Sequence, residues 1–84
     1  MSPYERLQKA KRKIAGTRQT TKAVQQGAAR VVYVARDAEP HVTQPLVAMC
    51  ADKAIEAVWV DSMYELGKAC GIEVKTASAA IIEE

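Results

Sequence analysis

The sequence predicts an α/β fold in which helices cover both faces of a small sheet. Two β-branched runs, Val31–Ala35 and Ala57–Val60, are typical of buried strands, and Ala77–Ile82 is expected to form a final strand. Signals for helix starts and ends lie before and between these runs, so helices and strands alternate along the chain. Ala, Val and Ile must fill the interior because there is no Phe, which suits close packing of helices on a sheet. We expect one domain over residues 1–84.

The first helix is expected at the start of the chain. Ser2 and Glu5 form a capping-box pattern, with Pro3 at the first helical position. Apolar residues at helical spacing then continue to Ile14. They are Tyr4, Leu7, Ala10 and Ile14. The pattern therefore predicts one helix up to Ile14, followed by a sharp turn at Gly16.

The second helix is predicted over residues 17–26. Thr17 can cap it with its hydroxyl, and Gly27 supplies a left-handed stop.

Two more helices are expected in the second half of the chain. One begins at the predicted cap Thr43, has Pro45 in its first turn and ends near Lys53. A second capping box, formed by Ser62 and Glu65, opens a short helix that ends at the next glycine, and a loop over residues 72–76 follows it.

The start of the second helix carries side chains that suit nucleic-acid binding. Arg18 and Lys22 share one helix face, and Gln19 lies near Lys22. A helix N-terminus favours anions, and these cations and this amide add reach towards phosphates and base edges. The alternative interpretation is an ordinary solvated helix start.

Charge is distributed very unevenly between the two halves of the chain. Residues 1–36 hold nine basic residues and one acidic residue, a net charge of +8, whereas residues 37–84 hold three basic and nine acidic residues, a net charge of −6. The overall charge of +2 conceals this polarity. Such asymmetry favours a polyanionic partner on one side of the molecule, although the two halves could instead pair with each other.

A second distinctive stretch begins inside the last helix. Gly67 lies inside the predicted helix, where glycine is about 1 kcal/mol less favourable than alanine. Close approach of a neighbouring backbone or ligand would explain why glycine occurs there. The loop residues Ile72-Glu73-Val74 could form an apolar platform for an unstacked base, with Lys68 and Lys75 near the same RNA backbone. Alternatively, the loop only covers the edge of the core.

Nothing in the sequence indicates catalysis, a metal or a cofactor. Cys50 and Cys70 are expected to be reduced core thiols, and His41 a solvated loop or helix-start residue. No phosphate-binding glycine motif occurs. The chain has no run of 18 apolar residues and starts with polar and charged residues, so we expect no membrane span, no signal peptide and a cytoplasmic location.

The two distinctive stretches together resemble a known family. Gly16–Val24, followed by a Val-rich strand that ends in Ala35-Arg36-Asp37, is similar to the kink-turn RNA-binding ribosomal-protein family, which includes archaeal L7Ae and eukaryotic L30e. Residues 66–74 and 77–82 match the C-terminal pattern of that family. The short length and the Arg18-Gln19 pair are most similar to the bacterial YbxF-like members.

The resemblance implies a three-layer α-β-α sandwich around a small mixed four-stranded sheet. It also implies recognition of the kink-turn, an RNA helix bent sharply at a bulge beside tandem sheared G·A pairs. An ordinary A-form major groove is too deep and narrow for side chains, but the bend opens it to the start of a helix. The implied partner is a structured RNA with a kink-turn, in ribosomal RNA, a riboswitch or another transcript. Separately, the absence of a coiled-coil seam leads us to expect a monomer, and we expect no membrane partner.

The resemblance also implies roles for individual residues. Arg18, Gln19 and Lys22 would contact bases, Gly16 and Thr17 would set the approach, and the loop 72–74 would cover an extruded nucleotide. Archaeal members typically carry Asn-Glu where this chain has Arg18-Gln19, which changes the hydrogen bonds available. The full set of expected RNA-binding residues is Gly16, Thr17, Arg18, Gln19, Lys22, Arg36, Lys68, Ile72, Glu73, Val74 and Lys75.

A rival interpretation is a protein-interaction module on a ribosome or ribonucleoprotein. It would use acidic residues of the second half, such as Asp37, Glu39, Asp52 and Glu56. An enzyme is the third alternative, although the sequence offers neither a nucleophile–base pair nor a metal cluster.

Overall fold

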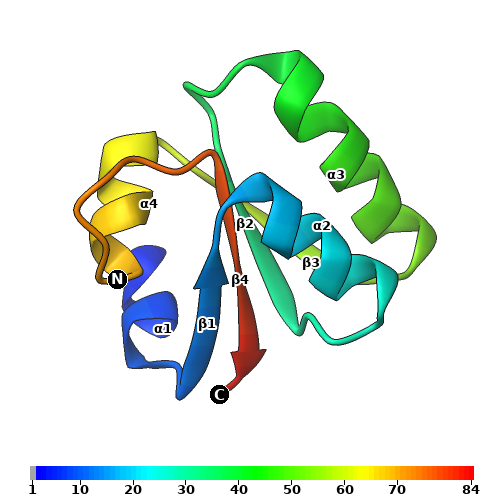
Figure 1. Ribbon diagram of the computed structural model, residues 1–84, viewed down its shortest axis with the longest axis horizontal. Coiled ribbons are helices and arrows are strands. Elements are labelled where there is room, and N and C mark those ends of the chain that lie inside the picture. Colours follow the sequence, from blue (N-terminus) through cyan, green and yellow to red (C-terminus); the bar gives the residue numbers. More distant parts are fainter. Residues whose placement is uncertain (1) are drawn as a thin grey trace.

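A mixed four-stranded sheet forms the centre of the computed structural model, which describes residues 2–84 (Figure 1). The strand order is β1 (Arg12–Ala15), β4 (Ser78–Glu83), β2 (Val31–Ala35) and β3 (Glu56–Val60). β4 pairs antiparallel with both of its neighbours, whereas β2 and β3 are parallel. The three strands expected from the sequence are therefore present, with bounds within one residue of the prediction.

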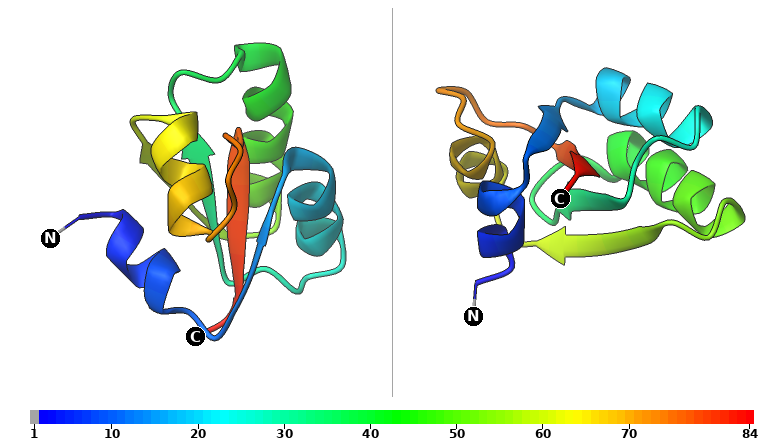
Figure 2. Two further views of the ribbon diagram at one scale, coloured as in Figure 1. Left: turned by 60° about the vertical axis from the view of Figure 1, so that its left-hand side comes forward. Right: turned by 90° about the horizontal axis from the view of Figure 1, so that it is seen from below.

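Two helices cover each face of this sheet (Figure 2). On one face lie α2 (Thr17–Gln25) and α3 (Pro40–Asp52), and on the other lie α1 (Tyr4–Lys9) and α4 (Met63–Ala69). This arrangement confirms the α/β class and the three-layer sandwich with a mixed sheet.

The central strand β2 supplies both halves of the core. Val31, Tyr33 and Ala35 face α1 and α4, and Val32 and Val34 face α2 and α3. All five are buried, as expected for a β-branched run without alternation. Each fully buried Val side chain contributes about 1.5–3 kcal/mol of transfer free energy.

The prediction of one N-terminal helix up to Ile14 was wrong. The helix ends at Lys9, Ala10 is extended, and the next residues form the edge strand β1. β1 pairs with β4 between Arg12 and Ala15, so its backbone hydrogen bonds go to the sheet. A helix through this segment would also stack Lys9 against Lys13 at i,i+4, which is unfavourable for like charges.

The start of the third helix was also placed wrongly, at Thr43. α3 begins at Pro40, which fits the first helical position because its missing N–H is not needed there. Pro45 lies inside the helix, and Thr43 is buried. His41 is exposed in the first turn, with Nδ1 3.1 Å from a carboxylate oxygen of Glu39.

The capping box predicted for the first helix was wrong, because Pro3 and not Ser2 is at the N-cap of α1, and the Ser2 hydroxyl accepts from the N–H of Tyr4. Two other local signals were interpreted correctly. Gly27 has a φ of +71° just after α2, as a left-handed stop requires. The Ser62 hydroxyl accepts a hydrogen bond from the N–H of Glu65 at 3.1 Å, which caps α4.

Candidate functional site

The turn between β1 and α2 fixes the start of α2 on the sheet. Gly16 has a φ of +103°, a conformation that L side chains rarely adopt. Its N–H donates to the carbonyl oxygen of Ser78 at 3.0 Å. The hydroxyls of Thr17 and Ser78 lie 3.0 Å apart. The predicted capping role of Thr17 was wrong, because Gly16 occupies the N-cap and the Thr17 hydroxyl holds α2 to β4 instead.

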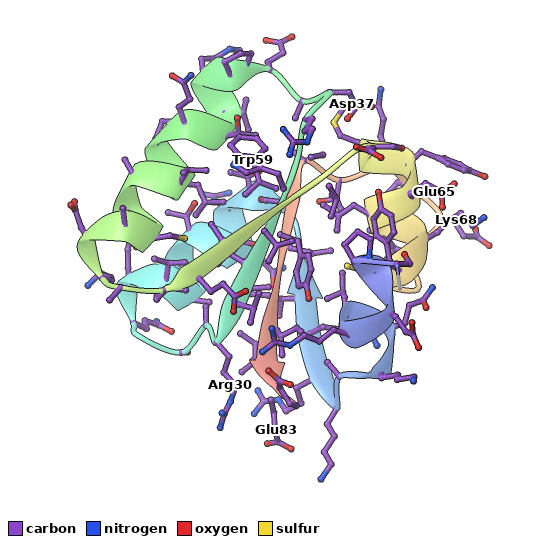
Figure 3. The ribbon with its side chains drawn as sticks, turned by 180° about the vertical axis from the view of Figure 1, so that it is seen from behind. Arg30, Asp37, Trp59, Glu65, Lys68 and Glu83 are labelled. Atoms are coloured by element: carbon purple, nitrogen blue, oxygen red, sulfur yellow. The ribbon has the colours of Figure 1, made fainter. Side chains whose placement is uncertain are left out.

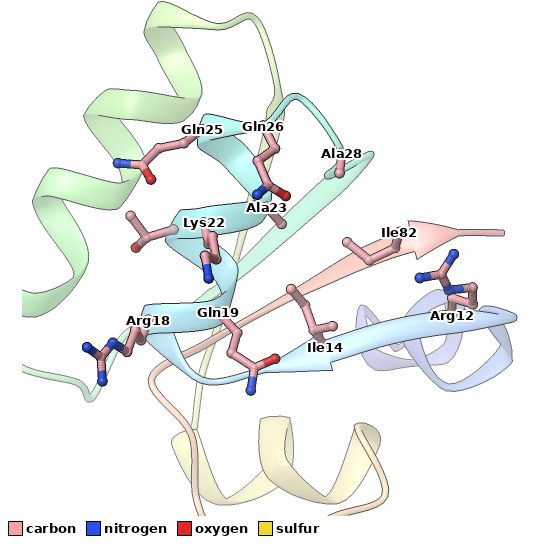
Figure 4. Close-up of a pocket in the computed structure, with 11 residues that line it drawn as sticks. Arg12, Ile14, Arg18, Gln19, Lys22, Ala23, Gln25, Gln26, Ala28 and Ile82 are labelled. Atoms are coloured by element: carbon pink, nitrogen blue, oxygen red, sulfur yellow. The ribbon is translucent and has the colours of Figure 1, made fainter.

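α2 is strongly amphipathic. Its buried residues are Thr20, Ala23 and Val24. Arg18, Gln19 and Lys22 are exposed on the other side, as the predicted shared face requires (Figure 4).

These three side chains line one hollow between α2 and the β1–β4 edge of the sheet, which we call the α2 hollow (Figure 4). Its volume is about 710 Å³. The polar lining consists of the cations Arg12, Arg18 and Lys22, the amides Gln19, Gln25 and Gln26, and Thr21. The apolar lining comprises Ile14, Ala23, Ala28 and Ile82.

The lining of the α2 hollow suits an anion with flat or apolar parts. Arg presents a planar fork of donors, Lys a compact charge, and Gln both donors and an acceptor. No acidic residue lines the hollow within the described chain. The hollow can therefore attract a polyanion without repelling it locally.

The second predicted stretch forms a separate, smaller hollow of about 260 Å³, which we call the α4 hollow. It is lined by Tyr64 and Lys68 from α4 and by Ile72, Glu73 and Val74 from the following loop. The Lys68 ammonium lies 5.6 Å from the centroid of the exposed Tyr64 ring. Val74 is 68% exposed, so the loop presents apolar surface to solvent.

Four predicted residues line neither hollow: Gly16 and Thr17 at the start of α2, and Arg36 and Lys75. The Arg36 guanidinium lies 5.7 Å from the centroid of Trp59 on the outer strand β3, which Figure 3 shows from behind. Lys75 is exposed beside the α4 hollow. The structure thus brings together Arg18, Gln19 and Lys22 in one place and Lys68 with the loop 72–74 in another.

Sequence reasoning missed several residues of both hollows. Arg12, Ile14 and Ile82 reach the α2 hollow only because β1 pairs with β4, and β1 had been assigned to a helix. Gln25 and Gln26 follow Lys22 by three and four residues, about one helical turn, so the 3.6-residue period offered a signal for them. Tyr64 offered no signal beyond being aromatic.

The described residues contain little other reactive chemistry. Both cysteines are free, and burial raises the pKa of the Cys50 and Cys70 thiols, which keeps them uncharged near neutral pH. Within residues 2–84 no three His, Cys, Asp or Glu side chains are grouped to hold a metal ion. No helix in this part of the chain is long and apolar enough to cross a membrane.

Comparison with known sequences identifies the family. The model of the ribosomal protein L7Ae/L30e/S12e/Gadd45 family matches residues 2–84. The chain belongs to this family. An RNA-binding protein of Halalkalibacterium halodurans is 45% identical over 78 residues, which cover 93% of this chain and 95% of the relative. An RNA-binding protein of Bacillus pumilus is 40% identical over 79 residues, which cover 94% and 96%.

Solved structures of similar fold agree with this family membership. The 15.5kD RNA binding protein of Giardia lamblia superposes with a TM-score of 0.84 and 29% identity, over 96% of this chain and 68% of that one. A Bacillus halodurans protein of unknown function gives a TM-score of 0.81 and 25% identity, over 95% and 80%. The α/β sandwich described above is therefore the fold of the L7Ae/L30e family.

Proposed function

We propose that this protein binds RNA through the α2 hollow and has no catalytic role. The observation that carries the proposal is that Arg18, Gln19 and Lys22 line one hollow, with no acidic lining residue in the described chain. Two relatives that match nearly the whole chain are named RNA-binding proteins, which supports the same partner.

The RNA feature that we propose is the kink-turn. Its bend and tandem sheared G·A pairs open a groove that is otherwise inaccessible, so the start of α2 can reach guanine edges. Gly16 supports this role because its positive φ turns the chain directly into α2. The exposed side chains then begin at Arg18, the second residue of the helix. Bound preferentially to the bent form, the protein would shift the RNA towards that form.

Arg18 and Gln19 give this chain its own set of contacts. Arg18 can donate two parallel hydrogen bonds to a guanine edge or pair with a phosphate. Gln19 can both donate and accept, so it suits a base edge that presents both kinds of group. Lys22, one turn later, is placed for a phosphate or a base oxygen.

In the same proposal the loop 72–74 packs against the nucleotide extruded at the bulge. Its two apolar side chains, Ile72 and Val74, would contact a base face, and Lys68 would lie near the phosphate backbone. Affinity would come mainly from phosphates, and specificity from the folded shape of the RNA.

Binding to a matched pair of RNAs tests this function. One RNA contains a kink-turn, and the control replaces its sheared G·A pairs by Watson–Crick pairs. We expect at least about tenfold tighter binding to the first in moderate salt, which corresponds to 1.4 kcal/mol. Equal, strongly salt-dependent binding to both would indicate a generic basic surface and contradict kink-turn recognition.

The structure gives little support to the rival protein-interaction module based on acidic residues. An Asp37 carboxylate oxygen accepts a hydrogen bond from the N–H of Met63 at 2.9 Å, at the start of α4. Glu56 lies 3.5 Å from the Arg6 guanidinium, and Glu39 pairs with His41. Three of the four acidic residues thus have partners within the protein. The expected single domain, monomeric state and cytoplasmic location stay predictions.

A further inference from the structure

The α2 hollow extends well beyond the start of α2. Arg12 on β1 lies at its far end, opposite Gln26 and Ala28, whereas Arg18 lies at the near end (Figure 4). A helix of nine residues is about 14 Å long. Phosphate charges follow one another at about 3.4 Å along the axis of each strand of a DNA duplex. The hollow is therefore longer than one nucleotide step, and contacts at the start of α2 leave its far end unfilled.

We propose that the far end of the α2 hollow binds the sugar–phosphate backbone of the RNA stem beside the kink, with Arg12 contacting a phosphate. This inference rests on the proposed RNA binding and extends its footprint to a residue outside the predicted set. The contact would fix the register of the stem and add affinity, but it would not discriminate between base sequences.

The walls of the far end fit a backbone better than a base. Ile14 and Ile82, half-buried on the neighbouring strands β1 and β4, project to the side on which α2 lies (Figure 4). They form an apolar floor for the ribose face. Gln26, at the end of α2, points towards this floor and can donate to phosphate or sugar oxygens without adding charge (Figure 4).

The Arg12 side chain is available for such a contact. It is exposed, and it has no carboxylate oxygen within 4.0 Å among residues 2–84. In contrast, Arg6 on the other side of the sheet is held by Glu56 and Glu84. Glu83 is the cross-strand partner of Arg12 in the sheet but does not line the hollow.

The salt dependence of RNA binding distinguishes a phosphate contact by Arg12 from a general attraction of RNA to the basic surface. Binding would be measured over a range of salt for the wild type, Arg12→Gln and Lys11→Gln, each with two kink-turn RNAs, one with long stems and one with the shortest stems that keep the kink. Lys11 is the matched control because it is exposed, adjacent in sequence and outside the hollow.

With the long RNA, we expect Arg12→Gln to reduce the slope of log Kd against log salt by about one and to weaken binding by roughly threefold to tenfold, as loss of one phosphate contact requires. Lys11→Gln should leave the slope unchanged, and Arg12→Lys should restore most of it. With the short RNA, all variants should bind like the wild type.

Two results would overturn the inference: an unchanged slope for Arg12→Gln, or equal slopes for Arg12→Gln and Lys11→Gln. Kink-turn recognition is read separately, from wild-type binding to the G·A RNA and its Watson–Crick control. Loss of that preference with a persisting Arg12 effect would reject only kink-turn recognition. Absence of any RNA binding by the wild type would reject both.

Discussion

The backbone of Val74 lies directly against Gly67 of α4. A Cβ atom at Gly67 would be 2.1 Å from the Val74 carbonyl oxygen, a separation at which one of the two segments must move. This confirms the expectation that close approach of a neighbouring backbone explains a glycine inside the helix. The same approach holds the loop 72–74 against α4, where the loop forms one wall of the α4 hollow.

We therefore expect Gly67→Ala to destabilise the protein. Alanine is about 1 kcal/mol better than glycine in a helix interior, but displacing a packed backbone costs more, typically 1–3 kcal/mol for overpacking. The net loss should be on the order of 1 kcal/mol in the free energy of unfolding. Urea unfolding, followed by the fluorescence of the single Trp59, measures it.

Lys68→Ala is the control for this experiment because Lys68 is the next residue of α4 and is exposed. Its effect should stay within about 0.5 kcal/mol. A Gly67→Ala protein as stable as the wild type would mean that the loop yields easily and that α4 does not hold it.

Much of the fold could be predicted because its signals are local. The run Val31–Ala35 is β-branched and buried on both sides, so one short segment sufficed to identify a buried strand. Gly27 and Ser62 act through their own backbone or through a neighbour three residues away. Such features depend on residues that are adjacent in the sequence.

The errors arose where distant pairing decides the outcome. Residues 12–15 have apolar positions that fit a helix, yet they form β1 because β4, more than 60 residues later, offers an unpaired edge. The same pairing brings Arg12 and Ile82 into the α2 hollow. The residues at the start of α2 were therefore predictable from the sequence of one helix, whereas Arg12 and Ile82 at the far end of the hollow were not.

Lys22 provides a direct test of the proposed site. Lys22→Ala removes a charge that lines the α2 hollow, and loss of a charged hydrogen bond costs about 1.5–3 kcal/mol, so kink-turn RNA binding should weaken by at least tenfold. Gln19→Ala should also weaken binding, by a smaller factor. The free energy of unfolding should change little because both side chains are exposed.

Lys53→Ala is the matched control for Lys22→Ala. Lys53 is also exposed, but it follows α3 and lines neither hollow. If both lysine variants reduced affinity equally, the α2 hollow would not be the specific site.

Ser62 should contribute to stability through its cap on α4. Ser62→Ala removes the acceptor for the Glu65 N–H and should cost about 0.5–2 kcal/mol of unfolding free energy in urea. Ser62→Asp should retain most of the stability because aspartate accepts the same hydrogen bond. An equal loss in both variants would indicate that packing of the hydroxyl, and not capping, is what matters.

The ion pair between Arg6 and Glu84 should make stability depend on acid pH. A hydrogen bond from Arg6 lowers the pKa of Glu84 below its ordinary value near 4.5. A carboxyl group with a lowered folded-state pKa stabilises the protein above its unfolded-state pKa, and this contribution is lost as the pH falls through the folded-state pKa. Glu84→Gln should therefore lower the urea midpoint slightly at about pH 7, and the difference from the wild type should be lost as the pH falls through the folded-state pKa of Glu84. Glu83→Gln is the matched control because Glu83 is the neighbouring residue and has no ion pair within 4.0 Å in the described chain. A Glu84→Gln difference that persisted unchanged in acid would show that the side chain acts through packing and not through its charge.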